Sequence, residues 1–149
     1  ELIADVSDLN SSVVPMIGDV PGGDLTLALQ QEAEVYIPFE TKKSNVIGLR
    51  VRGNSMSRLA PDGSYVIVDT DKIEPAQLNN QPVIVLIHNG FEFECSFKIY
   101  KRNPERFEPY SIEAGYDTIF PENREWKIFG SVIGTVGFIG EDAKLIEHQ

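Results

Sequence analysis

The sequence predicts a mainly β domain, made of antiparallel sheets that are partly closed, with a few short helical turns. Short runs rich in β-branched and aromatic residues recur along the chain. Turn signals separate these runs at intervals of about 8 to 12 residues, and no long helical periodicity interrupts them. This combination is typical of a partly closed, mainly antiparallel β fold.

The elements follow from these runs in order. The apolar segment Val13–Gly18 is expected to form a strand and leads into a turn-prone stretch that contains Pro21, Gly22 and Gly23. His88-Asn89-Gly90 is a strong hairpin signal. Later strands are expected at Glu34–Pro38, Asn45–Arg52, Ser64–Asp69, Pro82–His88, Phe91–Tyr100, Phe107–Pro109 and Lys127–Ile139, and short helical pieces at Leu25–Gln31, Ser55–Leu59 and Pro75–Leu78.

Composition and charge narrow the class of protein. With 149 residues, 42% of them hydrophobic and 24% charged, the chain has the size and composition of one globular domain. It has no apolar run of the roughly 18 residues that span a bilayer, and no visible signal peptide. The net charge of −10 argues against binding of nucleic acid by this segment. The single cysteine, Cys95, excludes an internal disulfide and fits a reducing compartment, so we expect a cytoplasmic protein.

Two residues suggest catalytic chemistry. Ser55 follows a predicted strand and a glycine, Gly53, which would present its hydroxyl at the end of a rigid element, as a nucleophile requires. Lys98 lies on a later predicted strand, and no histidine is suitably placed, so the pair suggests a Ser–Lys dyad. The alternative interpretations are that Ser55 caps a helical turn and that Lys98 is a solvated charge on the outer face of its strand.

These motifs resemble the self-cleaving domain of LexA and the lambda-type phage repressors. The resemblance covers nearly the whole chain. It includes the serine motif Arg52 to Met56, the lysine motif Ser96-Phe97-Lys98, a region similar to the cleavage site at Val14 to Gly23, and a closing strand at Ile128 to Gly134. It implies a fold like that of LexA and the signal peptidases. It also implies that residues 1–12 are a linker or arm from a missing N-terminal domain, and that residues 13–149 form the self-cleavage and dimerisation domain, with a cleavage-loop region at 13–32.

The resemblance also implies a mechanism. Ser55 would attack a peptide bond in the protein's own loop, and neutral Lys98 would take the hydroxyl proton. The backbone N–H groups of Asn54, Ser55 and Met56 would form the oxyanion hole. The matching cleavage site is Gly22-Gly23, whereas the family usually cuts between Ala and Gly.

The implied role is a repressor domain of a phage or prophage that is inactivated by self-cleavage during the SOS response. The expected partners are a second copy of the chain, in a dimer or higher oligomer, and an inducer, which is either the RecA–single-stranded DNA filament or an antirepressor. Operator DNA would be bound only through the missing N-terminal domain, and no membrane, cofactor or metal is expected.

Two alternatives stay open. One is a UmuD-like polymerase accessory protein that loses a short N-terminal arm, since only about 22 residues precede the candidate site. The other is a catalytically dormant oligomerisation domain of a repressor that an antirepressor controls, which Gly22-Gly23 favours. The Ser-x-x-Lys motif of penicillin-binding enzymes is absent because Arg58 stands where that lysine would be.

Overall fold

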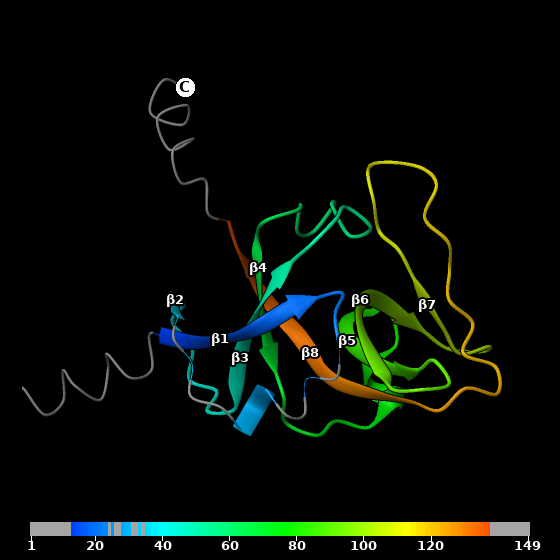
Figure 1. Cartoon of the computed structure of the whole chain (residues 1–149), viewed down its shortest axis with the longest axis horizontal. Coiled ribbons are helices and arrows are strands. Elements are labelled where there is room, and N and C mark those ends of the chain that lie inside the picture. The colour runs from blue at the N-terminus through cyan, green and yellow to red at the C-terminus, as the bar shows by residue number, and fades with distance from the viewer. Residues whose placement is uncertain (1–12, 24, 26–27, 31–32, 34, 138–149) are drawn as a thin grey trace, which may run out of the picture.

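A computed structural model describes residues 13–23, 25, 28–30, 33 and 35–137, and these form one mixed sheet of eight strands in the order β2-β1-β3-β4-β8-β5-β6-β7 (Figure 1). The strands are β1 (Val13–Val20), β2 (Val35–Pro38), β3 (Val46–Val51), β4 (Tyr65–Asp69), β5 (Gln81–His88), β6 (Phe93–Lys101), β7 (Arg106–Glu108) and β8 (Trp126–Val136); two short 3-10 helices are η1 (Ala28–Gln30) and η2 (Pro75–Leu78).

The mainly β prediction is confirmed, and the observed strands begin and end close to the predicted bounds. Two predictions were wrong in detail. β1 runs on to Val20, two residues past Gly18, and Ser55–Leu59 forms a series of turns rather than a helical piece. The predicted linker 1–12, the end of the last predicted strand and part of Leu25–Gln31 lie outside the described residues.

β8 joins the two halves of the sheet. It pairs with β4 through its C-terminal part and with β5 through its N-terminal part, so it runs between them in Figure 1 (orange). The register shifts on both sides, and Ser131 in β8 faces Asp69 on one side and Val83 on the other. All of these pairings are antiparallel; β1 with β3 is the one parallel pair among the named strands.

An isolated bridge brings the two ends of this arrangement together. Just past the end of β1, Gly22 pairs with Cys95 in β6 in antiparallel fashion. β1 and β6 are otherwise separated in the sheet by β3, β4, β8 and β5. The sheet is therefore not a continuous barrel, but this single bridge partly closes it next to the predicted cleavage site.

Both faces of the central strands are buried. One core cluster includes Val20, Met56, Cys95 and Phe97, and a second includes Val83, Tyr100 and Phe107. The alternating residues of β6 therefore point into two different apolar clusters. A strand whose two faces are both covered gives its polar side chains little access to water.

Glycine at position 130 is required where β8 passes from one neighbour to the other. A Cβ atom added to Gly130 would lie 2.6 Å from both the Asp69 carbonyl oxygen and a methyl group of Val68. We therefore expect Gly130→Ala to lower the free energy of unfolding by about 1–3 kcal/mol, as overpacking does. Urea unfolding would measure the change.

Gly137→Ala is the matched control, because an added Cβ there meets nothing within 4 Å in the part of the chain that the structure describes. It should be neutral or slightly stabilising, since alanine restricts the unfolded chain. Equal stability of the Gly130→Ala and Gly137→Ala proteins would contradict this account of the β8 crossing.

Candidate active site

Ser55 lies on the loop that leaves β3. Gly53 turns the chain with a φ of +85°, a conformation that side-chain-bearing residues rarely adopt. The Gly53 N–H donates to the Asp62 carboxylate at 2.8 Å, and the Asp62 N–H donates to the Asn54 side chain at 3.1 Å. Met56, only 1% exposed, anchors the next residue in the core. These contacts hold Ser55 on a rigid turn, although it is not in a helix or strand.

Lys98 points at Ser55. Its Nζ lies 3.1 Å from Ser55 Oγ and donates a second hydrogen bond to the Phe97 carbonyl oxygen at 3.2 Å. The residue is only 9% exposed, so the interpretation of Lys98 as a solvated charge is wrong. That face of β6 is not an outer face, because Val83, the partner of Lys98 on β5, is fully buried in the second core cluster.

The environment of Lys98 favours its neutral form. Burial removes water from the ammonium group and lowers the pKa of Lys98 below its ordinary value. Within the described residues, no Asp or Glu forms an ion pair with it that would oppose this effect. A neutral amine with a free electron pair, in contact with a hydroxyl, can take the hydroxyl proton.

The backbone around Ser55 contains N–H groups that make no hydrogen bond within the described residues. The carbonyl oxygens of Asn54 and Ser55 both accept hydrogen bonds, from the Ser111 hydroxyl at 2.7 Å and from the Tyr110 N–H at 2.8 Å. In contrast, the N–H groups of Asn54, Ser55 and Met56 have no acceptor in the part of the chain that the structure describes. Their use as an oxyanion hole stays a prediction.

The predicted cleavage site lies against the same strand as Lys98. The Gly22 N–H donates to the Cys95 carbonyl at 3.3 Å, and the Cys95 N–H donates to the Gly22 carbonyl at 2.9 Å. The carbonyl that Lys98 Nζ contacts, Phe97 O, is two residues further along β6. Two residues of a strand span about 7 Å, so the Gly22 bridge and the Lys98 amine occupy neighbouring positions on one strand.

In this arrangement the Gly22 carbonyl is hydrogen-bonded to β6 and is not positioned for attack by Ser55. Its oxygen is held by the Cys95 N–H, and a Cβ at position 22 would lie 2.8 Å from the Asp19 carbonyl oxygen. At Gly23, by contrast, an added Cβ would meet no atom of the described residues within 4 Å. Glycine at position 22 therefore permits this docked form of the loop, in which the Gly22 carbonyl is not bound by the N–H groups at Ser55.

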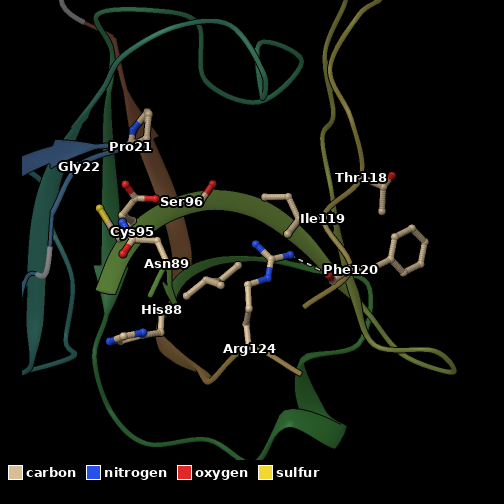
Figure 2. A pocket seen from close by; sticks show the side chains of 12 residues that line it. Pro21, Gly22, His88, Asn89, Cys95, Ser96, Thr118, Ile119, Phe120 and Arg124 are labelled. Carbon is tan, nitrogen blue, oxygen red and sulfur yellow. Dashed lines mark hydrogen bonds between the residues drawn. The ribbon is translucent and has the colours of Figure 1, made fainter. Parts of the chain in front are cut away.

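A cavity of about 590 Å³ opens beside the bridge, as Figure 2 shows. Pro21, Gly22 and Cys95 line one part of it, and Arg124 lines another and donates to the Phe120 carbonyl at 2.7 Å. Ser55 and Lys98 are not among its lining residues. The cavity therefore adjoins the loop that would be cut, not the dyad itself.

Sequence reasoning missed the residues that support the site. Ser111 and Tyr110 come from the segment after β7, more than 50 residues from Ser55, and no local pattern marks them. The backbone of Cys95 was likewise missed as the dock for Gly22, because Cys95 was considered only as a core side chain. That core interpretation is confirmed, since Cys95 is 1% exposed.

The described residues contain neither a membrane-spanning helix nor a cluster of metal-ligating side chains. No helix there is long and apolar enough to cross a membrane. No group of three or more His, Cys, Asp or Glu side chains in the same part of the chain could hold a metal ion.

The burial of Lys98 predicts how the stability of the fold depends on pH. Because its pKa is lower in the folded than in the unfolded chain, the unfolded chain holds the extra proton between the two values. The stability of the wild-type protein should then rise with pH in that window, by up to about 1.4 kcal/mol per pH unit, and level off near pH 10.4. Lys98→Met removes the buried amine, so the variant should be more stable than the wild type at pH 7. This difference in the free energy of unfolding should shrink as the pH rises.

Urea unfolding at pH 7 to 10 would measure this difference. Lys101→Met is the control on the same strand, since Lys101 is paired with Glu108 at the surface. It removes the same charge and the same side-chain length from an ion-paired position on β6. A Lys98→Met effect that stays constant across this range would contradict a neutral, buried Lys98.

Comparison with known proteins agrees with this geometry. No match to the chain was found among curated proteins. A family model described as Peptidase S24-like matches residues 15–133, which include Gly22, Ser55 and Lys98. Since the match covers most of its length, the chain belongs to the Peptidase S24-like family, the family of LexA, UmuD and the phage-repressor C-terminal domains with Ser–Lys chemistry.

Proposed function

We propose that this domain cuts its own chain near Gly22-Gly23, with Ser55 as the nucleophile and Lys98 as the general base. The observation that carries the proposal is the 3.1 Å contact between Ser55 Oγ and an amine that is buried without an acidic partner among the described residues. An ordinary surface lysine would be protonated at neutral pH and unable to accept a proton. Burial supplies the neutral base that the reaction needs.

The reaction conserves atoms and protons in two stages. Ser55 Oγ bonds to the carbonyl carbon of residue 22 while its proton moves to Lys98 Nζ, and the carbonyl oxygen becomes an oxyanion that backbone N–H groups stabilise. The bond to the nitrogen of Gly23 then breaks, and Lys98 returns the proton to that nitrogen. Water hydrolyses the resulting ester on Ser55, which leaves two chains and a free serine.

The loop must first leave its docked form. The Gly22 carbonyl oxygen has to exchange the Cys95 N–H for the N–H groups at Ser55. Each backbone hydrogen bond of this kind contributes about 0.5–1.5 kcal/mol net, so the exchange is a modest barrier that a partner could lower. Loop movement then gates the chemistry.

The biological role that we propose is that of the C-terminal domain of a cytoplasmic phage or prophage repressor. In this role the domain holds two repressor chains together, and cleavage separates it from a DNA-binding domain, so that bivalent binding to the operator is lost. The inducer would be the RecA–single-stranded DNA filament or an antirepressor. Family membership supports a LexA-, UmuD- or repressor-type domain in general, and a UmuD-like accessory protein would use the same chemistry.

One observation favours a second candidate, the catalytically dormant oligomerisation domain. The Gly22 carbonyl is paired with Cys95, and position 22 has no room for the alanine that the family usually has before the cut. A loop held permanently in this form would keep the carbonyl from Ser55. The two candidates differ in whether the chain ever cuts itself.

Incubation of the chain at pH 7 and at pH 10, followed by intact-mass measurement, separates the two. High pH deprotonates any Lys98 that is still charged, so we expect faster cutting at pH 10, with two fragments divided at or near Gly22-Gly23. The increase should level off above the pKa of Lys98.

Ser55→Ala should abolish the fragments, and Ser64→Ala, a change of the same size later in the loop, should leave them. Fragments that persist in Ser55→Ala would show that Ser55 is not the nucleophile. An intact wild-type chain at both pH values would favour the dormant domain.

A further inference from the structure

We propose that Ser111 is a positioning residue that aims the oxyanion donors of the Ser55 turn. This inference rests on the proposed function, since it concerns the same nucleophile. Ser111 lies in the long connection between β7 and β8, outside the serine and lysine motifs. Its hydroxyl donates to the Asn54 carbonyl oxygen at 2.7 Å.

The segment around Ser111 contacts the serine turn repeatedly. Next to the Ser111 bond, the Tyr110 N–H donates to the Ser55 carbonyl at 2.8 Å, and the Arg58 N–H donates back to the Tyr110 carbonyl at 3.1 Å. The Arg58 Nε also donates to the Ser111 carbonyl at 3.0 Å. The Asn54 carbonyl and the Ser55 carbonyl are thus both hydrogen-bonded to neighbouring residues of one segment, Ser111 and Tyr110.

The direction of the hydroxyl bonds can be assigned. A carbonyl oxygen only accepts, so the single Ser111 hydroxyl proton goes to Asn54. The Ser57 hydroxyl, 3.2 Å away, must then be the donor in the Ser57–Ser111 contact. Ser57 Oγ in turn accepts the Ile112 N–H at 2.9 Å, and Ser111 Oγ accepts the Glu113 N–H at 3.0 Å. The Ser111 hydroxyl is therefore fixed by partners on several sides.

Because peptide groups are planar, fixing these carbonyl groups also fixes the direction of the N–H groups of Ser55 and Met56. In a trans peptide the C=O and the N–H of one plane point in opposite directions. The Asn54 carbonyl shares its plane with the Ser55 N–H, and the Ser55 carbonyl shares its plane with the Met56 N–H. Because both carbonyl oxygens point toward residues 110 and 111, both N–H groups point away from that segment. They are also N–H groups with no acceptor among the described residues.

The functional consequence is preorganisation. An oxyanion hole stabilises a transition state because its donors are already aimed before charge develops. Loss of the Ser111 hydroxyl would remove the shorter of the two hydrogen bonds to the Asn54 carbonyl and leave it only the weaker bond from the Ser57 N–H at 3.2 Å. The plane between Asn54 and Ser55 would then be less firmly held, and a displacement of about 1 Å can cost roughly 100-fold in rate. Loss of this hydroxyl would not change the burial of Lys98, which lies on β6.

The test compares Ser111→Ala, Ser111→Thr and Ser64→Ala with the wild-type chain. Ser64→Ala is the matched control, because its hydroxyl also donates to a carbonyl of the same loop, that of Pro61 at 2.6 Å, but away from Ser55. Two rates are measured from pH 7 to pH 10: self-cleavage, and labelling of Ser55 by an organophosphorus fluoride. In the labelling reaction Ser55 Oγ bonds to phosphorus, fluoride leaves, and the hydroxyl proton passes to Lys98.

We expect Ser111→Ala to slow both reactions by about 10- to 100-fold without moving the midpoint of either pH profile, since Lys98 is unchanged. Ser111→Thr, which keeps a hydroxyl, should recover most of the rate, and Ser64→Ala should react like the wild type. Wild-type rates in Ser111→Ala, or equal losses in Ser111→Ala and Ser111→Thr, would overturn the proposal.

The labelling rate separates this inference from the proposed function. If the wild-type chain is labelled at Ser55 but never cuts itself, self-cleavage fails, and the labelling rates of the variants still decide the role of Ser111. If Ser55 is neither labelled nor active at pH 10, both proposals are overturned.

Discussion

The site depends on the burial of Lys98, which forms no ion pair with an Asp or Glu of the described residues. A buried ammonium group is costly, and proteins usually offset that cost with a carboxylate. Lys98 has instead a hydroxyl and a backbone carbonyl as neighbours, neither of which carries a full charge. Burial therefore favours loss of the proton and lowers the pKa of Lys98. The same arrangement that weakens the fold at neutral pH therefore creates a base next to Ser55.

The sheet topology explains why the base and the loop meet. β1 and β6 are far apart in strand order, yet the bridge between Gly22 and Cys95 brings the end of β1 onto β6. β1 also runs parallel to β3, and the Arg52 N–H donates to the Val20 carbonyl at 2.8 Å just before the Ser55 turn. The candidate cleavage loop is thus held between the strand that leads to the serine and the strand that carries the lysine.

Local sequence patterns predicted most of the strands, because alternation and turn residues determine them. They failed where distant segments decide the structure. The turns at Ser55 replace a predicted helical piece because the Ser55 carbonyl accepts the Tyr110 N–H and the Arg58 N–H donates to the Tyr110 carbonyl. The Asn54 carbonyl makes only a turn-like bond to the Ser57 N–H, beside its bond to the Ser111 hydroxyl. Alternation placed Lys98 on a polar face, but only the three-dimensional structure shows that this face is covered. The serine and lysine were found as candidates, whereas their supporting residues were not.

The pKa of Lys98 itself is the most direct test of this account. NMR titration of the protein with ¹³C-labelled lysine would follow the Cε signal of Lys98, assigned by its absence in Lys98→Met. The account predicts a midpoint well below the ordinary lysine value of about 10.4. A Lys98 signal that titrates together with those of the exposed lysines would mean that the amine is charged at neutral pH, and would contradict its role as the base.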